Sequence, residues 1–339
     1  MTTLQSYRAG FLAILSLAVL LSANEALAES SDSAEIIEVR KVWDQAKHNA
    51  FTDLIRHQDR WYCVFREATK HTVSYDGSLR VLTSTDGENW TSAALITMPE
   101  TDLRDAKISI TPDGKLMLCG YGRTEGERDR QTYVWFSEDG KTWSDAHPIG
   151  DRGYWIWRIV WHNGAAYGIG YKGGDNRDQD GHVRLYKGDD GKTFETLVPD
   201  LGPRSYPNET SLLFLEDGMA ICVLRRDGKA EQSALLGKAQ APYTNWKWED
   251  LGVRIGGPEA IRLPDGRFIV AGRKYPGGAK TQLWWLDPSS ASLKEAVELP
   301  SNGDSSYPGL VFHDGQLWVS YYSSHEGKSN IYVARVRFQ

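Results

Sequence analysis

The chain has 339 residues, of which 40% are hydrophobic, and a formal net charge of −6 at pH 7. This mild acidic excess disfavours nucleic acid as a partner, and the length suits one large β domain or two small domains. After the N-terminal segment, no stretch is apolar enough to predict a membrane span.

The first 28 residues are typical of an export signal. Arg8 provides a positive charge, residues 11–21 form a short apolar core, and residues 26–28 (Ala-Leu-Ala) form a small-x-small cleavage site. We therefore expect export to the periplasm or the medium, with residues 29–339 forming the folded domain.

A hairpin unit recurs six times along the rest of the chain. Each copy has an apolar strand, a tight turn and a second apolar strand, as expected of a β-hairpin. The turns fall at positions 60, 114, 164, 218, 266 and 315, so the period is roughly fifty residues. An all-β repeat of this length is typical of propeller blades, and the segments lack the 3.6-residue spacing of helical repeats. The copies cover residues 50–67, 104–123, 155–172, 208–226, 256–274 and 305–322.

Two further strands lie at the ends of this array. Residues 34–42 precede the first hairpin, and residues 329–336 follow the last one. We expect the N-terminal strand to become the outer strand of the last blade, because a ring must remove its exposed sheet edges. The predicted fold is therefore all-β, a six-bladed propeller with four-stranded antiparallel blades and an N-terminal strand that closes the last blade.

The three cysteines each fall in the second strand of a different hairpin. They are Cys63, Cys119 and Cys222. An odd number of cysteines on different blades favours buried free thiols over disulfides or a metal site. We expect no metal and no organic cofactor.

The outer strand pairs of the first three blades share a turn. In each, Asp-Gly is followed by an aromatic residue three positions after the glycine. We expect the aspartate to cap the turn, the glycine to adopt positive φ and the aromatic ring to fold beneath. The turn residues are Asp86 and Trp90, Asp139 and Trp143, and Asp190 and Phe194. These turns resemble the Asp boxes, or bacterial neuraminidase repeats, of the sialidase family, which implies a structural role for the aspartates.

A ring of polar residues is predicted at one mouth of the central funnel. In a propeller the inner strands converge there, so the starts of first strands and the ends of second strands meet. Polar groups at the ends of apolar strands indicate a pocket, and the alternative is a salt-bridged plug in the axial channel. The predicted substrate-binding residues are Arg66, Arg104, Asp105, Trp157, Arg158, Arg225, Glu259, Arg273 and Tyr322.

The resemblance to sialidases extends to this ring. That family uses a tyrosine nucleophile activated by a glutamate, an aspartate as acid/base, and three arginines that hold the substrate carboxylate. Tyr307, in Ser-Ser-Tyr-Pro-Gly-Leu, resembles the nucleophile. Glu209, in Asn-Glu-Thr-Ser, resembles its activator, and Arg225 resembles the second arginine. Asp76 lies where the acid/base aspartate is expected, and His71 in the same loop is a rival.

The sequence departs from the family at the other two arginines. The stretch at residues 48–54 (His-Asn-Ala-Phe-Thr-Asp-Leu) has no arginine at the matching place, and Lys280 resembles the third. Our leading hypothesis is an exported, monomeric exo-glycosidase acting on a terminal acidic sugar, with a glycan as its partner. The alternatives are an enzyme of the same fold acting on another glycan and a glycan-binding propeller without catalysis.

Overall fold

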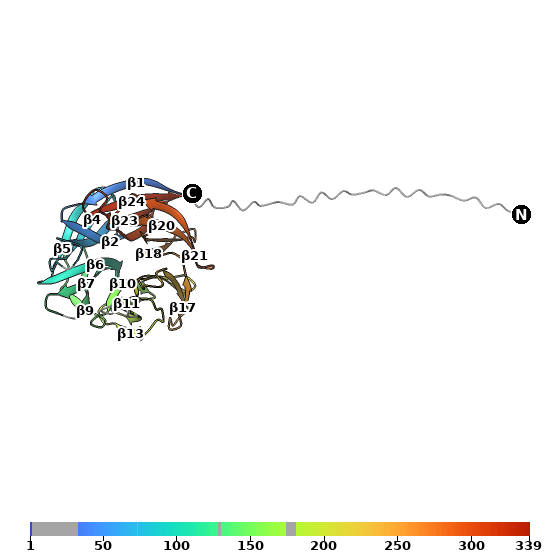
Figure 1. Cartoon of the computed structure of the whole chain (residues 1–339), viewed down its shortest axis with the longest axis horizontal. Coiled ribbons are helices and arrows are strands. Elements are labelled where there is room, and N and C mark those ends of the chain that lie inside the picture. Colours follow the sequence, from blue (N-terminus) through green and yellow to red (C-terminus); the bar gives the residue numbers. More distant parts are fainter. Residues whose placement is uncertain (2–32, 73, 128–129, 174–180) are drawn as a thin grey trace. The chain divides into compact units, whose positions relative to one another are not determined.

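The structure is a computed structural model that describes residues 1, 33–72, 74–127, 130–173 and 181–339. The segment from Ser33 onwards forms six sheets of four antiparallel strands arranged as a ring of blades (Figure 1). This confirms the predicted six-bladed β-propeller. The proposed export signal lies outside the described residues, apart from Met1. No helix in the described part of the chain is long and apolar enough to cross a membrane.

The first three blades follow one another along the chain. Blade 1 comprises β2 (His48–His57), β3 (Arg60–Ala68), β4 (Ser78–Ser84) and β5 (Thr91–Ile96). Blade 2 comprises β6 (Thr101–Ile110), β7 (Leu116–Thr124), β8 (Gln131–Ser137) and β9 (His147–Ile149). Blade 3 comprises β10 (Trp155–His162), β11 (Ala165–Lys172), β12 (His182–Gly188) and β13 (Glu195–Val198).

The last three blades complete the ring. Blade 4 comprises β14 (Pro207–Phe214), β15 (Ala220–Arg226), β16 (Leu235–Ala239) and β17 (Lys247–Asp250). Blade 5 comprises β18 (Gly256–Arg262), β19 (Phe268–Lys274), β20 (Lys280–Asp287) and β21 (Ser292–Leu299). Blade 6 comprises β22 (Ser305–His313), β23 (Gln316–Ser323), β24 (Asn330–Phe338) and β1 (Ala34–Trp43).

Blade 6 is built from both ends of the propeller segment. Its strand order is β1-β24-β23-β22, and β1 pairs antiparallel with β24, with Val39 opposite Ala334. The two strands lie side by side in Figure 1. The predicted closure by the N-terminal strand is therefore confirmed, and it covers the edge that β24 would otherwise expose.

The hydrophobic core lies between neighbouring blades. In β15, Ile221 and Val223 pack with Trp284 of blade 5, whereas Cys222 and Leu224 pack with residues of blade 3. Successive side chains of a strand point to opposite faces, so a strand between two blades buries every residue. This explains the continuous apolar runs in the sequence. All three cysteines are buried and free, as predicted.

The Asp-Gly turns have a common hydrogen-bond pattern. Asp86 Oδ1 accepts the backbone N–H groups of Glu88 and Asn89, both at 2.8 Å, and Gly87 has a φ of 76°. The indole of Trp90 donates to the carbonyl of Gly87 at 2.8 Å. Asp139 and Asp190 likewise each accept two backbone N–H groups. These carboxylates stabilise turns between outer strands, and their likeness to Asp boxes remains a resemblance.

Every inner strand is interrupted at the same place. In all six blades, two consecutive residues of the first strand lie opposite a single residue of the second strand. This arrangement is a β-bulge, with one extra residue in the first strand. The bulged pairs are Phe51-Thr52, Asp105-Ala106, Trp157-Arg158, Asn208-Glu209, Gly257-Pro258 and Tyr307-Pro308. Bulges re-aim side chains away from the normal alternation. Nearly all of the candidate site comes from these pairs or from the strand ends beside them.

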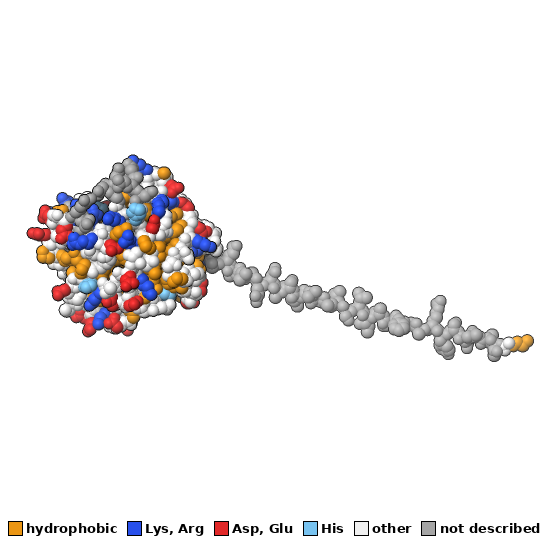
Figure 2. Space-filling view, turned by 90° about the horizontal axis from the view of Figure 1, so that it is seen from below, with side chains coloured by type: hydrophobic (Ala, Val, Ile, Leu, Met, Phe, Trp, Pro, Cys, Tyr) orange, Lys and Arg blue, Asp and Glu red, His pale blue; other side chains and the backbone are white. Residues whose placement is uncertain are grey.

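The charge on the surface is mixed. Figure 2 shows acidic and basic side chains interspersed on the face that it presents. This pattern agrees with the small net charge of the chain.

The contact between blades 6 and 1 generates a stability prediction. A Cβ added to Gly309 would lie 2.2 Å from the backbone nitrogen of Leu54, so Gly309→Ala must push two inner strands apart. We expect a loss of about 3 kcal/mol in the free energy of unfolding, the upper end of typical overpacking costs. Gly315→Ala is the control, because its Cβ meets nothing within 4 Å and carries only the cost of its positive φ, about 1 kcal/mol. Urea unfolding measures both, and equal losses would contradict the prediction.

Candidate active site

A hydrogen-bonded group formed by Tyr307, Glu209 and Arg225 lies at the start of the inner strands. The hydroxyl of Tyr307 donates to Glu209 Oε1 at 2.8 Å. Arg225 Nη1 donates to Glu209 Oε2 at 2.6 Å and to the Tyr307 hydroxyl at 2.9 Å. Tyr307 is 7% exposed and Glu209 is 8% exposed. Three residues from β22, β14 and β15 therefore share one network, although they are far apart in sequence.

Gly257 and Thr52 position this group. Gly257 has a φ of 56°, and its N–H donates to Glu209 Oε2 at 2.8 Å. A Cβ on Gly257 would lie 2.7 Å from Cγ of Tyr307, so the tyrosine ring packs where only a glycine fits. Thr52 Oγ1 donates to the carbonyl of Tyr307 at 2.8 Å, which anchors the bulged backbone of β22. Residues at three separate bulges thus define the orientation of one phenol.

The ring of Tyr307 is enclosed by aromatic groups and a cation. Its centroid lies 5.2 Å from that of Phe51 and 5.6 Å from that of Trp157. Tyr322 lies 5.9 Å away, and the guanidinium of Arg273 lies 5.1 Å from the ring centroid. Cations over aromatic faces are attracted by the ring quadrupole. The phenol therefore has apolar walls and two arginines within reach of it.

The electrostatics keep Tyr307 protonated in the resting protein. Burial raises its pKa well above the ordinary value and Glu209 adds to this effect, whereas Arg225 and Arg273 oppose it. The proton therefore remains on the phenol and is shared with Glu209 in a hydrogen bond. If the phenol oxygen forms a new bond, the proton can pass to Glu209 while the arginines stabilise the negative charge that develops.

Arg273, whose guanidinium lies near the Tyr307 ring, belongs to a second hydrogen-bond network. Its Nε donates to the carbonyl of Ser305 at 2.8 Å, and Nη2 donates to the hydroxyl of Tyr322 at 2.7 Å. The Tyr322 hydroxyl donates in turn to Asp304 Oδ1 at 2.8 Å. Arg273 and Tyr322 thus both line the candidate site and both contact Asp304.

A buried group of charges lies at one bulge of the inner strands, Arg158, and directly after three others, Asp53, Lys107 and Glu259. Arg158 donates to Asp53 Oδ2 at 2.9 Å and forms an ion pair with Glu259 Oε2 at 2.5 Å. Lys107 Nζ lies 5.2 Å from the ring centroid of Trp157 and donates to the carbonyl of Thr52. Burial raises the pKa of Glu259, whereas Arg158 acts in the opposite direction. Arg158 and Glu259 therefore have the pairing expected of the salt-bridged plug, the alternative that the sequence left open.

Asp105 is a buried carboxyl that lies in the bulge of β6. It has a φ of 49°, and its Oδ1 has no hydrogen-bond partner among the described residues. Burial raises its pKa to about 7, although Arg104 acts in the opposite direction. The carboxyl therefore keeps its proton to a higher pH than an exposed aspartate does.

Two predicted arginines make internal contacts away from Tyr307. Arg66 is fully buried, and its Nη2 forms an ion pair with Asp102 at 2.6 Å. Arg104 also forms an ion pair with Asp102, at 3.1 Å, and it donates to the carbonyl of His71. Its guanidinium lies 5.9 Å from the ring centroid of Phe51. Lys280, which resembles the third family arginine, lies 3.9 Å from Glu298.

The predicted acid/base residue and its rival lie in the loop between β3 and β4. Asp76 is exposed and accepts the backbone N–H of Thr69 at 3.1 Å. Burial acts to raise the pKa of Asp76, but hydrogen bonds from Ser74 and Thr69 outweigh it, and the pKa is lowered. No hydrogen bond or ion pair joins Asp76 to Tyr307 within the described ranges. The role of Asp76 stays a prediction.

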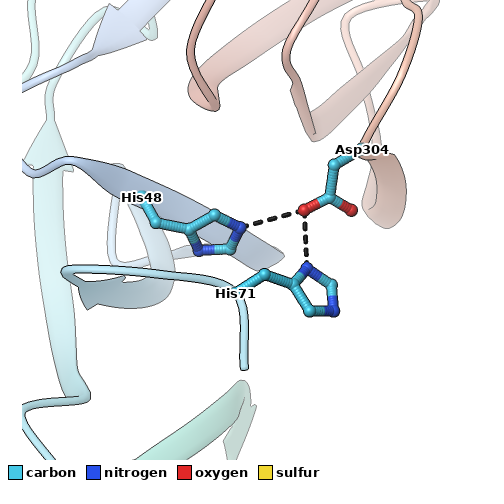
Figure 3. A group of neighbouring side chains, drawn as sticks. All are labelled: His48, His71 and Asp304. Carbon is cyan, nitrogen blue, oxygen red and sulfur yellow. Dashed lines mark hydrogen bonds and ion pairs between the residues drawn. The ribbon is translucent and has the colours of Figure 1, made fainter. Parts of the chain in front are cut away.

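His71 forms part of a cluster with His48 and Asp304, shown in Figure 3. Both imidazoles point at the same carboxylate oxygen. Sequence analysis did not single out His48, Asp304, Phe51 or Asp102. Asp304 lies one residue before β22. A search of the strand starts that also included the residue before each first strand would have found it.

Comparisons with known proteins identify the fold. No protein-family model and no curated protein matches the chain. A protein of unknown function from Dyadobacter fermentans superposes with a TM-score of 0.79 at 20% identity, over 91% of this chain and 100% of that chain. Trypanosoma rangeli sialidase has a TM-score of 0.70 at 12% identity, over 89% of this chain and 59% of that chain.

An α-L-arabinofuranosidase from Fusarium graminearum is also similar. Its complex with an iminosugar inhibitor has a TM-score of 0.67 at 13% identity, over 89% of this chain and 98% of that chain. The T. rangeli sialidase has also been solved with 2,3-difluorosialic acid as a covalent intermediate. At these identities the likeness shows the propeller fold, which this chain therefore shares with glycoside hydrolases of two specificities.

Asp105 generates a prediction about stability and pH. The native carboxyl keeps its proton up to about pH 7, whereas the unfolded one loses it near its ordinary value of 3.8. The native state therefore binds more protons between these values, and stability falls as pH rises across this window. Asp105→Asn imitates the neutral acid, so its stability relative to wild type should rise between pH 4.5 and pH 8, by up to about 3 kcal/mol.

Urea unfolding of both proteins at these two pH values measures the effect of Asp105. Other titrating groups, Glu259 among them, are common to both proteins, so the difference between them isolates Asp105. A difference in stability that does not change with pH would contradict the account of this carboxyl.

Proposed function

We propose that this protein is an exo-acting glycoside hydrolase of the sialidase type that removes a terminal acidic sugar. One observation carries the proposal: the Tyr307 hydroxyl donates to Glu209 while Arg225 contacts both. An unassisted phenol is a weak nucleophile, and an adjacent base is the usual means of activating one. A glycan-binding protein without catalysis has no need of this arrangement.

The proposed reaction has two steps. Tyr307 Oη forms a bond to the anomeric carbon while the bond to the leaving oxygen breaks. The phenolic proton passes to Glu209, and the leaving oxygen takes a proton from the protonated form of Asp76. Because the pKa of Asp76 is lowered, this form is favoured at acidic pH, and we expect turnover to fall as pH rises. Water then attacks the anomeric carbon and gives its proton to Asp76, and Tyr307 leaves and regains its proton from Glu209.

A neutral phenol suits a substrate with a carboxylate beside the reacting carbon. An anionic nucleophile would be repelled by that carboxylate, whereas a phenol that transfers its proton during attack is not. Arg225 and Arg273 both contact Tyr307 and provide positive charge at this place. The planar guanidinium matches a carboxylate with two parallel hydrogen bonds.

The role of Asp76 rests on its place in the chain. The loop between β3 and β4 carries both Asp76 and His71, and the ring of His71 lies 5.4 Å from that of Phe51. Phe51 in turn contacts Tyr307. The loop therefore reaches the margin of the site, where an acid would protonate the leaving group. We also propose that the protein is exported, on the strength of the N-terminal segment.

A neutral sugar is the second candidate substrate. Phe51 occupies the bulge in blade 1, in the stretch where the resemblance places an arginine. Arg225 and Arg273 are the arginines with a described contact to Tyr307. Both are also paired with carboxylates, Arg225 with Glu209 and Asp227 and Arg273 with Asp304, which reduces the positive charge that they offer to a substrate. Two cations give weaker carboxylate recognition than three. The arabinofuranosidase of similar fold makes an α-L-arabinofuranoside a suitable neutral test compound.

The assay compares wild type with variants of the central pair. We expect hydrolysis of a fluorogenic sialoside, with kcat reduced at least about 10³-fold in Tyr307→Phe and roughly 10²- to 10⁴-fold in Glu209→Gln. Tyr321→Phe is the matched control, because this buried tyrosine binds the carbonyl of Pro300 instead and should keep full activity. Wild-type turnover that survives in Tyr307→Phe would contradict the mechanism.

The same proteins assayed on an α-L-arabinofuranoside decide between the two substrates. Turnover of this compound alone, lost in Tyr307→Phe, would select the neutral sugar. Binding of either glycan without turnover by wild type would select the binding protein.

A further inference from the structure

We propose that His48, His71 and Asp304 form a binding site for a divalent transition-metal ion of the zinc class. His48 Nε2 lies 2.9 Å and His71 Nδ1 lies 2.6 Å from the same oxygen, Oδ2 of Asp304. All three ligand atoms lie within 4.8 Å of one another. Figure 3 shows the two imidazole nitrogens directed at that oxygen from different sides.

The orientation of the rings suits a common ligand centre. The two imidazole centroids are 5.2 Å apart, and the ring planes meet at 80°. Ligands at the Zn–N and Zn–O distances of about 2.0–2.1 Å are roughly 3.3 Å apart in a tetrahedron. His48 Nε2, at 2.9 Å from Asp304 Oδ2, therefore needs to move away from that oxygen by roughly 0.4 Å, and His71 Nδ1, at 2.6 Å, by roughly 0.7 Å. His71 lies in a loop with its side chain 46% exposed, so it has room to make this adjustment.

The donor set selects the class of metal. Imidazole nitrogen suits zinc, copper, nickel and iron, whereas calcium and magnesium take oxygen ligands. Two histidines and one carboxylate form the protein part of many sites that keep a further position open. The exposed side of His71 leaves space for such a position.

The neighbours of Asp304 orient its carboxylate for metal binding, and one of them also limits the affinity for the metal. The Tyr322 hydroxyl donates to Asp304 Oδ1, the oxygen that does not face the histidines. Outer hydrogen bonds of this kind orient a metal ligand. Arg273 Nη2 lies 3.4 Å from the same Oδ1, and its positive charge opposes a second cation nearby. Hydrogen bonds to Ser305 and Tyr322 keep the guanidinium in this position, so its charge weakens the affinity for a metal ion.

The position of the cluster gives the metal a role in substrate binding, and this role rests on the proposed function. The Phe51 ring lies 5.4 Å from that of His71 and 5.2 Å from that of Tyr307, so the cluster borders the candidate site. Phe51 lies in the stretch of residues 48–54, where the sialidase resemblance would place the first of three arginines. A metal ion beside it would restore positive charge on this side and bind an oxygen of the sugar at its open position.

Zinc binding to the full chain tests the site without any substrate. The chain is purified without a polyhistidine tag, treated with a chelator and titrated with Zn²⁺ by calorimetry. We expect one Zn²⁺ per chain, and an affinity reduced on the order of 100-fold or more in His71→Ala and in Asp304→Asn. Tyr322→Phe should weaken binding about 10-fold, as expected for an outer partner.

The controls exclude binding elsewhere. His313→Ala removes a histidine that pairs with Asp314 at 3.1 Å and should leave zinc binding unchanged. Absence of zinc binding, equal binding by His71→Ala and wild type, or equal binding of Ca²⁺ would each overturn the proposal. The first result would leave the cluster as two imidazoles hydrogen-bonded to one carboxylate.

The role in substrate binding has a separate readout. Zn²⁺ should lower KM for the sialoside in wild type and not in His71→Ala. If wild type binds one Zn²⁺ through these residues but hydrolyses no glycoside, the metal site stands and the proposed function fails. If it hydrolyses the sialoside with a KM that zinc does not change, the proposed function stands and this role fails.

Discussion

The bulge in every inner strand is the constraint on which the candidate site depends. Each inner strand packs against neighbouring blades, so regular alternation would direct its side chains into hydrophobic interfaces. One extra residue per strand breaks that alternation at the same level in all six blades. Tyr307 and Glu209 come from two such bulges, and Gly257 at a third provides an N–H for the glutamate and space for the phenol.

Burial then determines the chemistry of the groups brought together. The low-dielectric surroundings keep the proton on Tyr307 until an acceptor at hydrogen-bond distance takes it, and Glu209 occupies that position. Arg225 contacts both partners, so it can stabilise the charge wherever the proton lies. The resting site therefore holds a neutral phenol, a carboxylate and two guanidinium groups in a fixed arrangement, which is the set that the proposed mechanism requires.

The sequence predicted the fold because every blade repeats the same signals. Strands buried on both faces read as apolar runs, and the turns between them recur at about fifty-residue intervals. The sequence singled out Tyr307, Glu209 and Arg225 because they lie at strand ends and because the residues around them resemble sialidase motifs. The sequence did not reveal that Asp102 on the next blade binds Arg66, or that residues 48, 71 and 304 meet in one cluster. These contacts join different blades, and no periodicity within one blade encodes them.

The central claim is that Tyr307 forms a bond to the sugar. It is tested most directly by incubating the protein with 2,3-difluorosialic acid, the compound found as a covalent intermediate in the T. rangeli enzyme. Mass spectrometry of the digested protein then locates any adduct. The account predicts one sugar per chain, attached to the peptide that contains Tyr307. An adduct on another residue, or an unmodified Tyr307 in protein that hydrolyses the sialoside, would contradict it.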